Sequence, residues 1–168
     1  MSATHHTTQV GNNGTGGTTV ASAALSTTVG HCLLVISIAI TNTSSQVVSS
    51  ISGASLTWVA IPSAAISNGT NERMEKWCAF ANGTITSQVI TVTLSASAAA
   101  SVVVSAYSGA PIGNNGLNAI GAVNTATGSD NAPTLNLTTN SNGSLVIACR
   151  IRSAICHADL YDPSPSIR

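Results

Sequence analysis

Apolar residues along this chain come in short runs separated by polar turn residues. The strongest run covers residues 32–41, where Leu, Val and Ile follow one another with little polar interruption. Such a run is typical of a central strand that is covered on both faces. Residues 88–95 alternate instead, with Ile90, Val92 and Leu94 on one side and threonines on the other. This alternation indicates a strand with one buried and one solvated face.

No segment keeps an apolar period of 3.6 residues, and only residues 95–101 could form a turn of helix. Gly, Pro, Asn and Ser recur between the apolar runs, as expected for turns. The pattern predicts an all-β protein, an antiparallel β-sandwich of the jelly-roll or Ig-like type with about eight to ten short strands. We expect these strands at 18–25, 32–41, 46–51, 56–61, 72–81, 88–95, 101–107, 134–138 and 144–151, with weak strand character at 119–123.

The two ends of the chain differ from its middle. Residues 1–17 are polar and rich in Gly, Asn and Thr, so we expect a flexible N-terminal arm in which His5 and His6 are solvent-exposed. Residues 18–150 form the predicted sandwich domain. Residues 151–168 contain two prolines that cannot continue a central strand. We expect this C-terminal tail to lie across another subunit or to remain loose.

Charged residues make up only 6% of the chain, and its net charge is zero. Five Lys and Arg residues are too few for a nucleic-acid-binding surface, and they form no polybasic patch that would hold a membrane. The longest apolar run is too short to span a bilayer. Glu72, Arg73, Glu75 and Lys76 form a dense group of charges, which we expect to be a solvated rim.

Residues 1–6 show no basic segment followed by an apolar one, so no signal peptide is visible. Two explanations stay open: the mature form of a secreted protein that carries a new Met, or a protein that is made and used without export, as virion components are. Both place the protein at a virion surface or outside the cell. Six Asn-x-Ser/Thr sequons fall at predicted turns, where we expect turn-forming asparagines rather than glycosylation sites.

The four cysteines allow three pairings, between which the sequence does not decide. One interpretation is buried free thiols, and another is a disulfide that involves Cys149 or Cys156. No CxxC motif occurs, and the spacing of Cys149, Cys156 and His157 fits no zinc site. We expect neither a metal nor a cofactor.

No arrangement of residues predicts catalysis. The five acidic residues show no pairing suited to glycoside hydrolysis, His31 has no recognisable nucleophile or acid, and no P-loop or dinucleotide fingerprint occurs. We therefore expect a protein that is not an enzyme. Aromatic residues are scarce, which draws attention to Trp58 and Trp77 as candidate ligand-binding residues. Their rings either pack in the core or offer a face to a ligand such as a sugar.

Several segments together resemble a widespread family of bacterial and phage β-sandwich domains, over about residues 18 to 150. The family's strand motifs G-N-L-L-V, V-T-V-T, v-x-v-x-x-Y-S-G and G-s-L-V-i-A are similar to residues 30–35, 89–94, 102–110 and 143–148, and its V-t-D-s-x-G-N-t-W segment and aromatic strand are similar to residues 48–58 and 75–81. The resemblance implies a secreted surface module or a phage particle protein. The family's acidic and asparagine turn positions are missing at residues 53–55. Its closing strands are not recognisable in residues 150–168, which implies that a partner chain completes the fold.

The leading hypothesis for function is a virion structural protein, either a capsid decoration or a fibre-like component, that self-associates through its sandwich and terminal arms. The alternatives are a carbohydrate-binding or adhesive surface module and a subunit of an extracellular bacterial filament. The expected partners are further copies of the chain, a major capsid protein or other virion proteins, or cell-surface glycans. Nucleic acids and membranes are not expected as partners.

Overall fold

The computed structural model describes residues 3–41, 45–110, 115–128, 134–140, 144–152 and 155–161, with side chains as far as residue 151. These residues form ten strands with antiparallel pairing and one short 3-10 helix, which confirms the predicted all-β antiparallel sandwich. The elements are β1 (Thr4–Asn12), β2 (Gly17–Ala21), β3 (Cys32–Thr41), β4 (Val48–Ser52), β5 (Val59–Ala60), β6 (Ile66–Asn68), β7 (Glu72–Ala81), β8 (Thr91–Ser108), η1 (Leu117–Ala119), β9 (Val146–Arg152) and β10 (Ile155–Tyr161).

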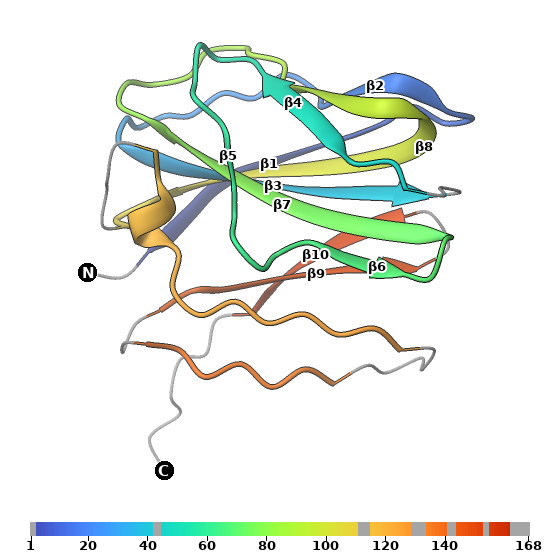
Figure 1. The fold of residues 1–168 in the computed structure, drawn as a ribbon. Helices are drawn as coiled ribbons and strands as arrows, with labels where there is room; N and C mark the ends of the chain where they lie inside the picture. Colours follow the sequence, from blue (N-terminus) through green and yellow to red (C-terminus); the bar gives the residue numbers. More distant parts are fainter. Residues whose placement is uncertain are drawn as a thin grey trace.

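The long strand β8 builds both layers of the sandwich. Its C-terminal part pairs with β1 and β3, and β3 pairs in turn with β7, which also carries β5 and β6; we call these strands the wide layer. Its N-terminal part pairs with β2 and β4, and these form the narrow layer. Between the two parts, the pairing with β2 jumps from Gly17↔Ala98 to Thr19↔Thr93. At this irregularity β8 curves from one layer into the other (Figure 1).

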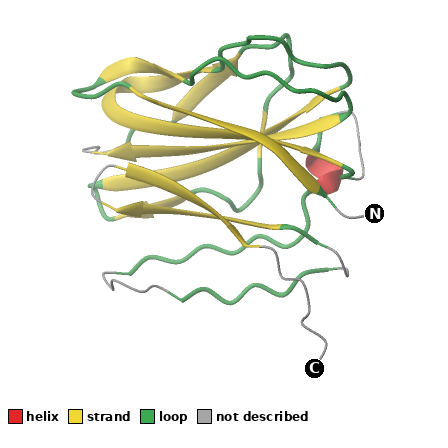
Figure 2. Ribbon diagram, turned by 180° about the vertical axis from the view of Figure 1, so that it is seen from behind, coloured by secondary structure: helices red, strands yellow, loops and turns green. Residues whose placement is uncertain are grey.

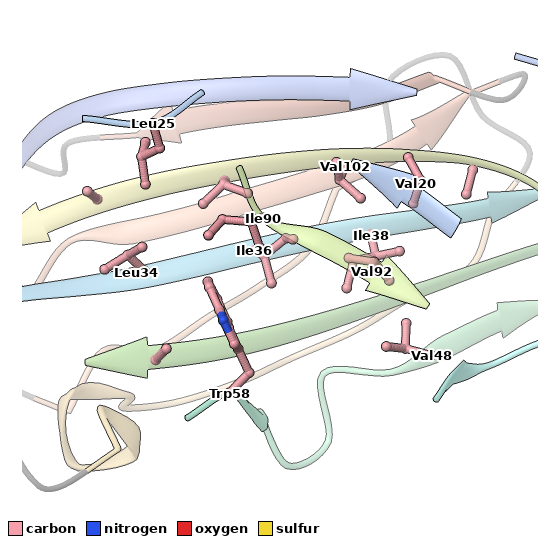
Figure 3. Packing of buried hydrophobic residues seen from close by; sticks show 14 of the residues in the cluster. Val20, Leu25, Leu34, Ile36, Ile38, Val48, Trp58, Ile90, Val92 and Val102 are labelled. Atoms are coloured by element: carbon pink, nitrogen blue, oxygen red, sulfur yellow. The ribbon is translucent and has the colours of Figure 1, made fainter. Parts of the chain in front are cut away.

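The space between the wide and narrow layers is the sandwich core. Alternate residues of β3 point into it, because side chains alternate across a strand. They meet residues of β2, β4 and β8 in one large apolar cluster (Figure 3). Burial of this much branched aliphatic surface is the main stabilising contribution to the fold. Members of the cluster with no exposed surface include Leu25, Leu34, Ile36, Ile38, Ile40, Ile90, Val92 and Val104.

The other face of the wide layer is also covered. Here η1, the extended segments 120–128 and 134–140, residues 144–145 and the hairpin of β9 and β10 form what we call the C-terminal layer (Figures 1 and 2). β10 lies against β3 and β8, and Cys149 and Ile151 of β9 pack on Ala39 and Val103. The whole of β3 is therefore buried, as its continuous apolar run predicted.

The predicted flexible arm at residues 1–17 is wrong for most of its length. Residues 4–12 form β1, which pairs with residues 101–108 of β8. The polar sequence of β1 gives no apolar alternation, although threonine is a good strand former. Gly11, which looked like a turn residue, is glycine for a different reason: a Cβ there would lie 1.8 Å from the carbonyl oxygen of Ala21. Its backbone therefore passes too close to residue 21 for any side chain.

The predicted domain boundary at residue 150 is also wrong, because it falls inside β9. Residues up to 161 continue in the β9–β10 hairpin, with Ile151 paired to Cys156, and this hairpin packs on the protein's own wide layer. Residues 162–168 of the predicted tail lie outside the described residues. The strands predicted at 119–123 and 134–138 are extended segments without ladder pairing, and the helical turn considered at 95–101 is part of β8.

Candidate functional site

A large cavity lies between the wide layer and the C-terminal layer, with a volume of about 1120 Å³. One wall is made by alternate residues of β3, β7 and β8, including Leu33, Val35, Met74 and Tyr107. The opposite wall is the C-terminal layer, from η1 through β9. The two extended segments of that wall are held together where the amide of Asn124 donates to the carbonyl oxygen of Asn136, over 2.7 Å. Ligand sites are usually concave and largely apolar, and this cavity has both properties.

Lys76 of β7 lines this cavity, and it is the single lysine of the chain. Its Nζ donates a hydrogen bond to the backbone carbonyl oxygen of Ile147, across the cavity wall, over 2.8 Å. Burial lowers the pKa of Lys76 to about 8 because the ammonium loses much of its hydration. None of the described carboxylates forms an ion pair with it. Among the described residues, the cation is therefore held by a neutral group.

Two other charged residues line the same cavity. Glu72 lies four residues before Lys76 on the same face of β7, about 13 Å away along a strand that rises about 3.3 Å per residue. Arg150 of β9 is exposed and already has a partner within the molecule. The remaining polar lining includes Asn68 of β6 and Tyr107 of β8 on the side of the wide layer, and Asn, Thr and Ser side chains of the C-terminal layer.

Glu75 points to the opposite face of β7, between the wide and narrow layers, and is buried. Its Oε1 accepts from Nε of Arg73 over 2.7 Å and from the backbone N–H of Val48 over 3.2 Å. Its Oε2 accepts from the indole N–H of Trp77 over 3.2 Å. The prediction of a solvated charge rim at residues 72–76 is therefore wrong, because Glu75 joins β7 to β4 from inside the sandwich and Lys76 faces a cavity.

The two tryptophans lie toward the sandwich core rather than together on an open surface. Trp58 is 8% exposed and belongs to the core cluster (Figure 3). Its indole N–H is buried without a hydrogen-bond partner among the described residues. Trp77 is partly buried, packs against the same cluster, and donates to Glu75. Trp58 thus has the core role that the sequence allowed, and its ring offers no face for a sugar to stack on.

The cysteines fall into two kinds. Cys32 and Cys78 are buried free thiols, and burial raises the pKa of Cys32 and raises that of Cys78 to about 11. Both therefore stay protonated and unreactive at neutral pH. Cys149 is disulfide-bonded. The sequence predicted a disulfide that involves Cys149 or Cys156 without deciding the pairing, and Cys156 belongs to β10, whose side chains lie outside those described. Among the described residues, no group of three or more His, Cys, Asp or Glu could hold a metal ion.

The histidines near the N-terminus are anchored on β1. Nε2 of His6 lies 2.7 Å from Oγ of Ser108, and Nε2 of His5 lies 2.8 Å from Oγ1 of Thr8. Neither ring is paired with a described carboxylate, which the histidine of a catalytic triad requires. The expectation that both histidines sit in a mobile arm is wrong, and their hydrogen bonds fix the geometry of β1.

Strand β1 forms one edge of the wide layer. Near its C-terminal end this edge is covered, because the carbonyl oxygen of Val10 accepts from the N–H of Ala23 over 2.9 Å. Residues two apart in a strand direct their backbone groups to the same side. The N–H and C=O of Thr8 therefore also point away from β8, and no described segment pairs with the edge over residues 4–9. This stretch is called the free β1 edge below.

Comparison of the chain with family models, with curated proteins and with solved structures gives no match. No helix in the described part of the chain is long and apolar enough to cross a membrane. What the protein does must therefore be argued from its own geometry, from the free β1 edge and from the cavity around Lys76.

Proposed function

We propose that this protein is a non-enzymatic virion structural protein, a capsid decoration or fibre-like component, whose copies associate by strand pairing at the free β1 edge. The observation that carries the proposal is this edge, with outward backbone N–H and C=O groups over residues 4–9. An unpaired strand edge is a ready template for another strand, and natural monomers usually block it.

Strand β1 has a register irregularity between His5 and Thr7, but it lacks the charged residues and prolines that most often block an edge. Its nine residues include no Lys, Arg, Asp, Glu or Pro, and β2 and β4 in the narrow layer are equally uncharged. Across the whole chain only 6% of residues are charged, so like-charge repulsion between copies is weak. A protein whose role required it to remain a monomer would be expected to carry charge or proline here.

A single substitution tests the edge. Thr8→Pro removes the outward N–H without removing a hydrogen bond to β8, so it should weaken self-association about tenfold or more in sedimentation of the whole chain. Thr8→Val is the matched control: it removes the same side-chain hydrogen bonds to His5 and Ser105 but keeps the N–H. It should associate like the wild type. A wild-type chain that stays monomeric at high concentration would refute pairing at this edge.

The location of the protein is a separate question. Mass spectrometry of density-banded particles from the native source should find the chain at a fixed ratio to a major capsid protein. Recovery only in a cell-surface fraction would instead reject the virion role. It would favour the filament subunit, if the edge variants still affected assembly, or an adhesive module, if they did not.

A further inference from the structure

We propose that the cavity between the wide layer and the C-terminal layer binds an amphiphile with an unbranched apolar chain and a carboxylate head group, the head group pairing with the ammonium of Lys76. This site is independent of the free β1 edge and of the proposed role in assembly. The size and lining of the cavity, the surroundings of its lysine and the placement of its other charges all favour such a ligand.

The size and lining suit a long apolar chain. The volume of about 1120 Å³ lies slightly above the usual range for small-molecule sites, which is about 300–1000 Å³. Strands β3, β6 and β7 and the loop between β5 and β6 contribute aliphatic side chains to one side, and the C-terminal layer contributes more to the other. Examples are Leu33, Ile66 and Met74 on the first side and Ile120, Leu137 and Ile147 on the second.

The charge of the site suits an anionic head group. Lysine is seldom buried without a partner, yet the chain's single lysine faces this cavity and not the solvated surface. Its hydrogen bond goes to the neutral carbonyl of Ile147, which offsets only part of the cost of desolvating an ammonium. The lowered pKa of Lys76 is the expected result of that unmet cost. An anion in the cavity would supply the missing counter-charge.

The other charges orient such a ligand. Glu72 would repel a carboxylate at its end of β7, so the head group is favoured at Lys76 and the apolar chain elsewhere. Arg150 already has a partner within the molecule, so Lys76 is the cation of the described lining at which an anionic head group is expected. A neutral lipid would fill the space without neutralising the ammonium, and a cationic one would be repelled.

Calorimetric titration of the whole chain with three probes of equal chain length tests the proposal: dodecanoate and dodecyltrimethylammonium below their micelle concentrations, and dodecanol below its solubility limit, all at pH 7. Dodecanoate should bind with one-to-one stoichiometry and about tenfold more tightly than the other two. Equal binding of all three would show a non-specific apolar surface and overturn the proposal. Absence of dodecanoate binding up to about 1 mM, where apolar binding energies are still measurable, would do the same.

Three variants sharpen the test. Lys76→Met keeps the side-chain length and should remove the preference for dodecanoate over dodecanol, whereas Lys76→Arg should keep it. Glu72→Gln is the matched change on the same strand face and should leave dodecanoate binding unchanged or strengthen it. If Lys76→Met does not fold, NMR of the wild-type protein labelled with ¹³C-lysine still tests the pairing, because its single lysine gives one signal. Dodecanoate should move that signal and raise its pKa, and an unmoved signal would place the carboxylate elsewhere and contradict the proposal.

Discussion

The two faces of β3 are both buried, but they are buried in different ways. On one face Leu34, Ile36 and Ile38 meet side chains from both layers of the sandwich and leave no exposed surface. On the other face Leu33 and Val35 are nearly as well shielded from solvent, yet they line a cavity of about 1120 Å³. Low exposure therefore does not imply close packing. We expect the first face to hold the fold together, because dispersion contacts need neighbouring atoms, and the second to leave room for a ligand.

Two adjacent leucines of β3 test most directly whether its two faces differ in packing. Leu34→Ala should cost about 4 kcal/mol of unfolding free energy, because it leaves a hole in the sandwich core. Leu33→Ala removes the same atoms from a second, smaller apolar cluster that lines the cavity, and it should cost about 2 kcal/mol because this cluster has fewer buried members than the sandwich core. Urea denaturation of both variants measures the difference. Equal costs would mean that the cavity closes in solution and that the two faces are alike.

A second pair of variants compares the two faces of β7. Glu75→Gln should cost about 3 kcal/mol, because the amide leaves Arg73 without its charge partner and cannot accept the three hydrogen bonds that the carboxylate accepts. Glu72→Gln makes the same change on the cavity face, where the side chain has no such partners among the described residues, and should fall within about 0.5 kcal/mol of wild type. Thermal unfolding of both variants measures the two losses of stability. A loss for Glu72→Gln as large as that for Glu75→Gln would contradict the predicted difference between the faces.

The pH dependence of stability probes Lys76 in particular. Its pKa is about 8 in the folded protein, against 10.5 for an ordinary lysine, so between these values the unfolded chain binds more protons than the folded one. Stability contributed by this group therefore rises as pH increases from about 8 to 10.5, by an amount on the order of 2 kcal/mol.

The buried thiols and Tyr107 act in the opposite direction, because burial raises their pKa values. The useful quantity is thus the stability difference between wild type and Lys76→Met, measured by urea denaturation at pH 7 and pH 10. Wild type should gain on the variant as the pH rises. A constant difference would mean that Lys76 is well hydrated, and the cavity would then be an open surface.

The smallest expected effect on global stability concerns the C-terminal layer. Reducing the disulfide of Cys149, or replacing Cys149 by Ser, should raise amide hydrogen exchange in β9 while shifting the global unfolding free energy by less than about 1 kcal/mol. The amides of β3, which lies between β7 and β8, serve as the internal reference for the exchange rates. If β3 exchange rises as much as β9 exchange, the C-terminal layer is part of the cooperative core.

The strands that could be predicted from the sequence are those that contain a clear apolar pattern of their own. The expected strands at 32–41 and 72–81 coincide with β3 and β7, and the runs at 88–95 and 101–107 are the two halves of β8. β1 was missed because its stability comes from pairing with residues about 90 positions later, and its own threonines and histidines carry no hydrophobic pattern.

The candidate cavity could not be predicted from the sequence for a related reason. Glu75 and Lys76 are neighbours in a charged stretch, and nothing local separates the buried carboxylate from the cavity lysine. The separation appears only when β4 covers one face of β7 and residue 147 reaches the other. One signal was present: a single lysine in 168 residues, placed between strand-forming residues and not in a turn.

The pairing of β1 with the far end of β8 has a consequence for how the protein is made. Asn12 pairs with Ser101 and Thr4 with Ser108, so β1 is synthesised well before the strand with which it pairs. At about 5–20 residues per second, roughly 5–20 s of synthesis separate β1 from its partner. During that time β1 has neither edge paired, and nascent chains on one message carry many copies of it side by side. The β1 strand of one nascent chain can therefore meet the β8 strand of a longer nascent chain before its own β8 has been synthesised.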